Sequence, residues 1–277
     1  MTDQNKTMGR AIVRPPSANF AEGLTSVDLG VPVYQRALEE HEAYCAALQE
    51  CGLRLTRLEA DPHYPDSTFV EDTAVLIEAL PYGRATAPVS AGERCAILAR
   101  PGAGSRVGEV ATMQQWLAQF YSELHSIREP GTLDGGDVCE AGNHFFIGIS
   151  KRTNEEGAQQ LAELLASFGL NSSFVDIRGV KNILHLKSGV AYLGDDRLAL
   201  IDALADRDEF RGYNLIRVSA GEEYAANCLR VNDHVLMAAH YPALERSMRD
   251  LGYQTISLEM SEFRKMDGGL SCLSLRF

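Results

Sequence analysis

The sequence predicts a single α/β domain over residues 1–277, built as a five-bladed α/β propeller of ββαβ units around a central axis. Two observations predict this fold. Pairs of apolar, β-rich runs joined by turn residues recur along the chain, and each pair is followed by a helical pattern and one further strand. The fifth copy of this unit is divided between the two ends of the chain, as in rings that close on themselves. An irregular α/β sheet is the alternative that the pattern leaves open.

Four hairpins are predicted, because turn residues separate two strand-like runs in each of them. Their ranges, with the turns in parentheses, are 73–99 (81–94), 137–149 (141–144), 189–201 (194–196) and 227–239 (232–233). The link 81–94, PYGRATAPVSAGER, is the longest of these turns, and we expect a surface loop without a catalytic effect. Whether this loop alters contacts between copies of the chain is left open.

A helix and a third strand are predicted after each hairpin. Apolar residues at helical spacing place the helices at 106–121, 155–168, 202–211 and 242–251. The strands that follow are 123–128, 172–178, 213–218 and 253–258, and Gly169, Gly212 and Gly252 stand at expected C-terminal caps. In the divided unit, helix 33–51 and strand 53–58 combine with terminal strands at 10–14 and 269–277.

Composition and charge limit the class of protein. The chain has 45% apolar residues, which excludes an intrinsically disordered polyanion, and its net charge is −12. The absence of a Lys/Arg cluster argues against nucleic acids and anionic membrane surfaces as partners. No run of about 18 uncharged apolar residues exists, and the N-terminus lacks the apolar stretch of a signal peptide. We therefore expect a cytoplasmic protein that acts on a small molecule.

The cysteines divide into two groups. Five of the six lie in helical or strand-like apolar patterns and are expected to be small buried hydrophobes: Cys45, Cys51, Cys95, Cys139 and Cys228. No CxxC or CxxH spacing occurs, so a structural zinc site is not predicted. Cys272 differs, because it stands among the polar residues described next.

Polar residues stand directly before the first strand of several predicted units. Since these strands would line the axis of the ring, the side chains would converge at one of its ends. They are Glu71, Asp72, Asp134, Asp137, His185, Asn227 and Cys272. Each has a structural alternative: the aspartates could stabilise turns, His185 could be a hydrogen-bonded core residue, and Cys272 could be buried packing.

The types of these residues point to covalent catalysis on a cation. A cysteine nucleophile needs a nearby acid/base group, typically histidine. Two carboxylates beside a thiol would suppress thiolate formation, because like charges repel each other. A cationic substrate would neutralise them, and a planar guanidinium is the natural match for paired carboxylates.

The chain resembles the dimethylarginine dimethylaminohydrolase family of the guanidino-modifying, or pentein, superfamily. The matching motifs occur in order over nearly the whole chain. They are RPPSANFAEGLTS (14–26), PDSTFVEDTAV (65–75), ARPGAGSRVGE (99–109), GTLDGGDV (131–138), FFIGISKRTNEEGA (145–158), LHLKSG (184–189), YAANC (224–228) and MDGGLSCLSLRF (266–277). The resemblance implies a pentein fold and no cofactor. The longer link at 81–94 departs from the tight turn of the family.

The resemblance also implies roles for individual residues. Cys272 matches the nucleophile and His185 the acid/base, while Asp134 matches the triad carboxylate, which is Glu in some members. Residues 22–30 match a mobile lid. The remaining matches bind substrate. The guanidinium would be held by Asp72 with Asp134, and the α-carboxylate by Arg106 and Arg152. The α-ammonium would be held by Asp66 and the carbonyls of Leu24 and Met266, and further positions of the pocket match Phe69, Glu71 and Ser271.

The implied reaction is hydrolysis of Nω-methylated L-arginines to L-citrulline and dimethylamine or methylamine, through a covalent thiouronium on Cys272. Two alternatives stay open: an arginine or agmatine deiminase of the same superfamily, and a non-catalytic relative that binds a ligand. No functional metal is predicted, although zinc inhibition through Cys272 and His185 is conceivable. A homodimer is left open.

Overall fold

The structure, a computed structural model, describes residues 8–77 and 94–277. The expected surface loop at 81–94 therefore lies outside the described residues, apart from Arg94. The chain divides into two units, each of which is described by itself. We call them the terminal unit, Met1–Val70 with Lys187–Phe277, and the middle unit, Glu71–Leu186.

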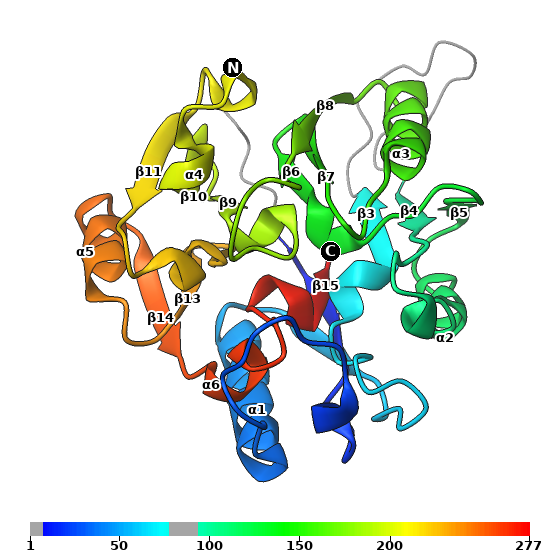
Figure 1. Cartoon of the computed structure of the whole chain (residues 1–277), viewed down its shortest axis with the longest axis horizontal. Coiled ribbons are helices and arrows are strands. Elements are labelled where there is room, and N and C mark those ends of the chain that lie inside the picture. Colours follow the sequence, from blue (N-terminus) through cyan, green and yellow to red (C-terminus); the bar gives the residue numbers. More distant parts are fainter. Residues whose placement is uncertain (1–7, 78–93) are drawn as a thin grey trace. The chain divides into compact units, whose positions relative to one another are not determined.

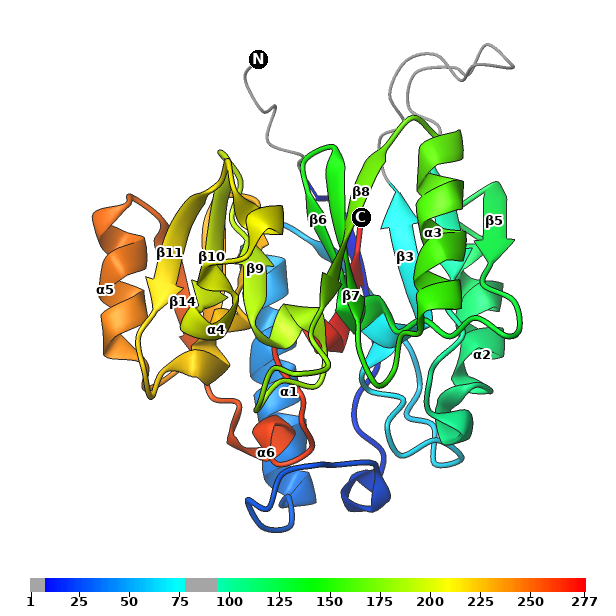
Figure 2. The same ribbon diagram turned by 45° about the horizontal axis from the view of Figure 1, so that its top comes forward.

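The middle unit contains two three-stranded sheets among its described residues. In both sheets the first two strands are antiparallel, and the third strand runs parallel to the second. One sheet has the order β3 (Ala74–Ile77), β4 (Cys95–Leu98) and β5 (Glu123–Ser126), with α2 (Glu109–Leu117) between β4 and β5. The other has the order β6 (Val138–Ala141), β7 (His144–Ile149) and β8 (Asn171–Asp176). Its helix α3 (Glu155–Ser167) packs along β8 (Figure 2).

The terminal unit contains three sheets of the same pattern among its described residues (Figure 1). The first has β9 (Val190–Tyr192), β10 (Arg197–Ile201) and β11 (Asn214–Val218), with the short helix α4 (Asp202–Ala205). The second has β12 (Leu229–Val231), β13 (His234–Ala238) and β14 (Gln254–Leu258), with α5 (Pro242–Asp250) packed on β14.

The third sheet of the terminal unit joins the two ends of the chain. It has β15 (Ser274–Arg276), β1 (Arg10–Val13) and β2 (Arg54–Arg57), with α1 (Tyr34–Glu50) between β1 and β2. Ala11 lies opposite Arg276 in the antiparallel pair, and Arg10 lies opposite Arg54 in the parallel pair. The predicted division of the fifth unit between the chain ends is therefore confirmed.

Local backbone conformation explains why the predicted turns and caps form. Asp195, Asp196 and Asn232 have φ values of 50°, 55° and 52°, and Asp and Asn tolerate this left-handed region better than most residues. The glycine that follows α3, Gly169, has a φ of 76°, which suits a C-terminal cap, and Gly252 after α5 has 89°.

Three helical segments differ from expectation. The predicted helix 106–121 narrows to α2, because a 3₁₀ turn (Gly104–Arg106) precedes it. The predicted helix 202–211 breaks after α4, since Arg207 adopts an extended conformation with ψ of 139°. The short helix α6 (Ser261–Arg264) was not predicted, because four residues are too few to show a helical period.

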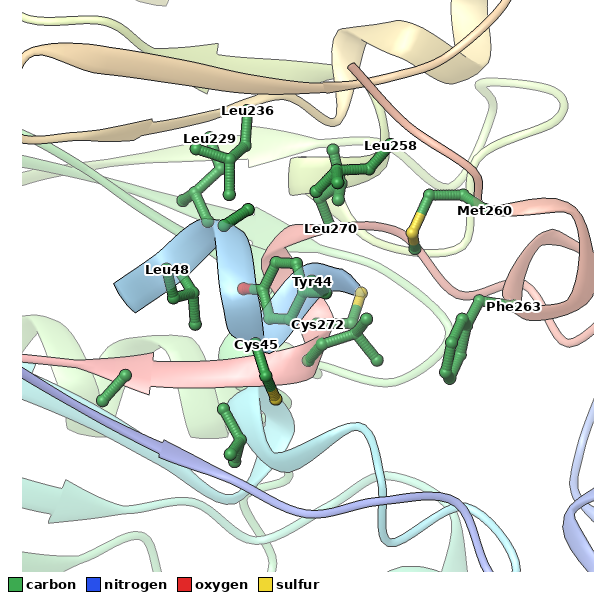
Figure 3. Packing of buried hydrophobic residues seen from close by; sticks show 14 of the residues in the cluster. Tyr44, Cys45, Leu48, Leu229, Leu236, Leu258, Met260, Phe263, Leu270 and Cys272 are labelled. Carbon is green, nitrogen blue, oxygen red and sulfur yellow. The ribbon is translucent and has the colours of Figure 1, made fainter. Parts of the chain in front are cut away.

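Each unit has its own buried apolar cluster. In the terminal unit, Tyr44 of α1 is fully buried in a cluster that includes Leu229 and Leu270 (Figure 3). Its hydroxyl lies 2.6 Å from Ser274 Oγ. In the middle unit, Ile97 and Phe145 lie in a second cluster with residues of α3. The six cysteines all fall within the described residues and are buried, including the five that were predicted to be small buried hydrophobes. No helix of the described chain is long and apolar enough to cross a membrane.

A 3₁₀ turn stands shortly before the first strand of each sheet in the described chain. The turns are Val70–Thr73, Gly135–Asp137, Leu186–Ser188, Glu223–Ala226 and Ser271–Leu273. The polar residues singled out in the sequence lie in these turns or next to them. The turns therefore present these side chains at equivalent places of the repeated unit.

Candidate active site

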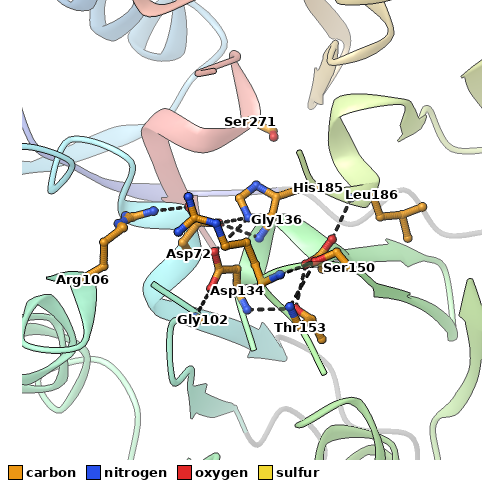
Figure 4. Close-up of polar contacts among 12 residues, drawn as sticks. Asp72, Gly102, Arg106, Asp134, Gly136, Ser150, Thr153, His185, Leu186 and Ser271 are labelled. Atoms are coloured by element: carbon orange, nitrogen blue, oxygen red, sulfur yellow. Dashed lines mark hydrogen bonds and ion pairs between the residues drawn. The ribbon is translucent and has the colours of Figure 1, made fainter. Parts of the chain in front are cut away.

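The acid/base candidate His185 is paired with a buried carboxylate in the middle unit. His185 Nε2 lies 2.9 Å from Asp134 Oδ2, and both side chains are buried (Figure 4). The other oxygen, Asp134 Oδ1, accepts a hydrogen bond of 2.8 Å from the backbone N–H of Gly102. Because both carboxylate oxygens have partners, Asp134 can fix the orientation of the imidazole.

Asp72 lies near the same imidazole nitrogen as Asp134. Its Oδ1 accepts a hydrogen bond of 2.9 Å from Gly136 N–H and lies 4.0 Å from His185 Nε2. A side chain at Gly136 would not fit, since a Cβ there would lie 2.8 Å from both Asp72 Oδ1 and His185 Nδ1. The glycine therefore allows the backbone, the carboxylate and the imidazole to meet.

The charges of this cluster shift its protonation equilibria. Burial lowers the pKa of His185, but the carboxylates of Asp72, Asp137 and Asp134 outweigh burial and raise that pKa to about 9. Burial raises the pKa of Asp72, and the charges of His185 and Arg106 more than reverse this, so that it lies below its usual range. At neutral pH the site therefore holds an imidazolium among carboxylates.

Arg106, predicted to bind a substrate carboxylate, is buried between two carboxylates of the protein. Its Nη1 lies 2.6 Å from Asp72 Oδ2, and its Nε and Nη2 donate to Glu109 Oε1 and Oε2 at 3.0 and 2.8 Å. Glu109 is not among the residues singled out from the sequence. Its spacing three residues after Arg106, at the start of α2, is the signal that could have found it.

Arg152, the second predicted carboxylate ligand, is half-buried. It lies in the segment between β7 and α3, where its backbone N–H donates to Ser150 Oγ at 2.9 Å. Glu71 is buried in the 3₁₀ turn before β3, where Gly135 approaches its carbonyl closely. The roles of Arg106, Arg152 and Glu71 in substrate binding stay predictions.

The nucleophile candidate Cys272 is buried in the terminal unit, within the 3₁₀ turn Ser271–Leu273. The preceding residue, Ser271, is held by Asn227, whose Oδ1 accepts from Ser271 N–H at 2.9 Å and whose Nδ2 donates to Ser271 Oγ at 3.1 Å. Asn227 Nδ2 also donates to the carbonyl of Lys187 at 2.9 Å. Asn227 therefore fixes the turn that carries the thiol.

The residues predicted to hold an α-ammonium group also lie in the terminal unit. The backbone N–H of Leu24 donates to both oxygens of the buried Asp66, at 3.0 and 3.2 Å. Met266 is buried in the same apolar cluster as Phe69. The expected lid 22–30 is mostly exposed, and Thr25 Oγ1 donates to the carbonyl of Lys265 at 2.9 Å. Movement of this segment stays a prediction.

The structure thus brings the predicted residues together in two sets. The middle unit gathers Asp72, Arg106, Asp134 and His185, and the terminal unit pairs Leu24 with Asp66 and places Ser271 and Cys272 against Asn227. The proximity of Cys272 and His185 stays a prediction.

Three ligand atoms of the middle unit are close enough together for a metal ion. Asp72, Asp134 and His185 each offer one atom within 4.8 Å of the others. These side chains already bond one another, Arg106 and backbone N–H groups. Because this arrangement satisfies them without an ion, we assign no metal to it.

Comparison with known proteins identifies the family. No family model matches the chain. The N(G),N(G)-dimethylarginine dimethylaminohydrolase of Pseudomonas aeruginosa is 43% identical over 267 residues, which cover 96% of this chain and 98% of the relative. The chain belongs to the dimethylarginine dimethylaminohydrolase family. The resemblance predicted from the sequence motifs is therefore confirmed.

Solved structures of dimethylarginine dimethylaminohydrolase also establish the fold. A Cys-to-Ser mutant of the P. aeruginosa protein, complexed with citrulline, matches with a TM-score of 0.88 and 41% identity over 98% of this chain and 100% of that chain. A His-to-Gly variant, solved as an adduct with S-methyl-L-thiocitrulline, matches with the same TM-score, identity and coverage. The five sheets are the blades of an α/β propeller, as predicted, and the chain is an enzyme of this family.

Proposed function

We propose that the chain hydrolyses Nω-methylated L-arginines to L-citrulline and dimethylamine or methylamine. The observation that carries the proposal is the buried cluster of His185, Asp134 and Asp72 in a chain of this family. The cluster contains a protonated imidazole, that of His185. It also contains a carboxylate, Asp72, which binds the guanidinium of Arg106. These are the groups that hydrolysis of a guanidinium requires.

The first half of the reaction forms a covalent intermediate. The Cys272 thiolate attacks the guanidinium carbon, and a C–S bond forms. The bond from that carbon to the methylated nitrogen then breaks, and its electron pair stays on the departing amine. His185 gives this amine a proton, because an unprotonated amine is a poor leaving group. Asp72 and Asp134 hold the remaining nitrogens and stabilise their positive charge, and the product is an S-alkylthiouronium on Cys272.

The second half of the reaction releases the product. Neutral His185 takes a proton from water, and the resulting hydroxide adds to the thiouronium carbon. The C–S bond breaks with its electron pair on sulfur, which restores the thiolate and leaves a protonated urea. This group loses its hydroxyl proton to solvent and becomes the neutral urea group of citrulline. One histidine thus acts first as a general acid and then as a general base, each role contributing about 10²–10⁴-fold.

Residues outside this centre would bind the amino-acid end of the substrate. Arg152 and Arg106 would meet its α-carboxylate. Its α-ammonium would meet Asp66 and the carbonyls of Leu24 and Met266. Phe69, Glu71 and Ser271 would line the pocket. Arg106 would have to exchange part of its contact with Asp72 to do so, since that contact is 2.6 Å long.

The variants of the relatives support the assignment of the two catalytic side chains. The cysteine replaced in the citrulline complex and the histidine replaced in the thiocitrulline adduct are as far apart in residue number as His185 and Cys272. That a relative was solved with citrulline also supports citrulline as the product here.

The proposal is tested by incubating the full chain with asymmetric dimethylarginine, monomethylarginine, arginine and agmatine, and measuring citrulline and the released amines. We expect citrulline from both methylated arginines. Ammonia from arginine or agmatine with no product from the methylated arginines would favour a deiminase, and no product from any of them would favour a non-catalytic relative.

A pair of cysteine variants tests the nucleophile. Cys272→Ser is expected to lower kcat by about 10³-fold or more. Cys51→Ser is a matched control, because Cys51 is also buried in the terminal unit but follows α1. It is expected to keep the kcat of the wild type. Equal activities of the two variants would contradict the role of Cys272.

Three further expectations belong to this proposal. We infer that residues 1–277 act as a single domain. We also infer a cytoplasmic location, in keeping with a small-molecule substrate. A homodimer stays open, and size-exclusion chromatography with light scattering would decide it.

A further inference from the structure

Asp137 is a fully buried carboxylate of the middle unit to which the proposed reaction assigns no step. It ends the 3₁₀ turn Gly135–Asp137 before β6, and its side chain has three hydrogen-bond donors. Its Oδ1 accepts from the backbone N–H of Leu186 at 2.9 Å. Its Oδ2 accepts from Ser150 Oγ and from Thr153 Oγ1, both at 2.7 Å. Figure 4 shows the three partners, Leu186, Ser150 and Thr153.

Each partner of Asp137 is next to a residue of the candidate active site in the sequence or is hydrogen-bonded to one. Leu186 is the residue after His185. Ser150 Oγ accepts from the backbone N–H of Arg152 at 2.9 Å, and Thr153 Oγ1 accepts from the backbone N–H of Asp134 at 3.1 Å. One carboxylate thus holds three segments, which carry the acid/base, its carboxylate partner and a predicted substrate-binding arginine.

The direction of these hydrogen bonds favours a carboxylate over an amide at residue 137. A hydroxyl has one hydrogen to donate. The hydroxyls of Ser150 and Thr153 give theirs to Asp137, which leaves their lone pairs to accept from backbone N–H groups. An amide in the same place would point its NH₂ at both hydroxyls if its oxygen still faced Leu186 N–H. The hydroxyl hydrogens would then lack their acceptor.

The neighbouring strand leaves room for this arrangement. Gly148 lies in β7, and a Cβ there would lie 2.9 Å from Asp137 Oδ1 and 2.9 Å from Leu186 Cβ. A side chain at Gly148 would push apart the carboxylate and the peptide that it holds.

The negative charge of Asp137 also acts on the imidazole of His185. Burial raises the pKa of Asp137 to about 6, against the opposing effects of His185, Ser150 and Thr153, so the carboxylate is ionised above that pH. Charged groups of the described middle unit that act on His185 include Asp72, Asp134 and Asp137, and Arg106 is bound to Asp72. Each of the three carboxylates favours the imidazolium.

We propose that Asp137 is a positioning residue that holds the His185, Asp134 and Arg152 segments in one arrangement and stabilises the protonated imidazole by its charge. The proposal rests on the proposed function, in which His185 donates a proton to the leaving amine. Asp137 would hold these segments through Leu186, Ser150 and Thr153, without contact to substrate.

Asp137→Asn in the full chain tests the role of the charge. The variant keeps the size of the side chain and an acceptor for Leu186 N–H. We expect kcat for asymmetric dimethylarginine to fall by about 10-fold or more. We also expect the alkaline limb of the pH profile of kcat to move down by about one pH unit, the low end of the effect of a nearby opposite charge. A purely structural role would lower kcat without moving this limb.

The His185 imidazole is titrated in parallel by NMR on wild type and on Asp137→Asn. This readout does not depend on turnover, so it separates the two proposals. If the wild type forms no citrulline, the proposed function fails, while the titration still tests the charge of Asp137. A folded Asp137→Asn protein with the wild-type midpoint and the wild-type alkaline limb would overturn the proposal.

Ser150→Ala is the matched second variant, because it keeps the charge of Asp137 and removes one of its donors. Arg152 N–H loses its acceptor, so we expect KM to rise several-fold while the alkaline limb stays in place. If Asp137→Asn does not fold, this variant decides the positioning role. Wild-type values of both KM and kcat in Ser150→Ala would then overturn it.

Discussion

Replacement of Glu109 is expected to reveal the cost of breaking a buried ion pair. Arg106 cannot lose its proton in a protein, and its side chain is only 5% exposed between Asp72 and Glu109. Glu109→Ala removes the acceptors of two N–H groups of Arg106 and leaves its contact with Asp72 in place.

The magnitude follows from the burial of both partners. Removing one partner of a buried ion pair typically costs about 3–5 kcal/mol, because the remaining charge loses that compensation. The Glu109 side chain is 1% exposed, so water cannot replace it at low cost. Glu109→Gln retains one acceptor, and we expect it to cost about 1–3 kcal/mol.

The assay is urea denaturation of the full chain, followed by tryptophan fluorescence. The single tryptophan of the sequence, Trp116, lies in α2 with Glu109, so it reports on this part of the middle unit. Glu129→Gln is the control, because Glu129 pairs with Arg100 but its side chain is 79% exposed. We expect that control to change the free energy of unfolding by less than about 1 kcal/mol. Equal stabilities of Glu109→Ala and Glu129→Gln would refute the reasoning.

Two further predictions concern His185 and Asn227. The folded-state pKa of His185, about 9, lies above its unfolded value of 6.5, so its stabilisation is complete below pH 6.5 and is lost as pH rises through 9. We expect the free energy of unfolding to fall by about 3 kcal/mol over this range in wild type but not in His185→Gln, and parallel curves from urea titrations would contradict this. Asn227→Ala leaves the backbone groups of Ser271 and Lys187 without their Asn227 partner, and we expect a loss of about 1–3 kcal/mol by thermal or urea unfolding. Ser271→Ala keeps both backbone contacts and should lose less, so the reverse order of stabilities would be inconsistent with the role of Asn227.

The repeated unit could be predicted from the sequence because its signals are local. Turn residues such as Asn232 adopt left-handed conformations that few other residues tolerate, and they separate runs of β-rich residues by short distances along the chain. Glycines such as Gly169 end helices for the same reason. Helix boundaries were less certain where the local signal is weak. The predicted helix 202–211 breaks at Arg207, which has an extended backbone. No Gly or Pro next to Arg207 indicates this break in the sequence.

The candidate catalytic residues could be chosen from the sequence, because their chemical types and their places before equivalent strands are visible there. The partners of these residues could not. Arg106 was expected to meet a substrate carboxylate, and the structure places it between Asp72 and Glu109. Asp137 was a turn residue with no assigned contact, and the structure places three donors around it.

The difference has a physical cause. The repeat and the residue types depend on short-range conformational preferences and side-chain chemistry, which the sequence by itself determines. The partners of a buried carboxylate depend on which segments meet it in space. Asp137 is bonded by groups from the segment after β7 and from the segment that follows His185, up to 49 residues away along the chain. Only the tertiary structure determines which segments contact Asp137, and these contacts also affect the protonation state of the His185 imidazole.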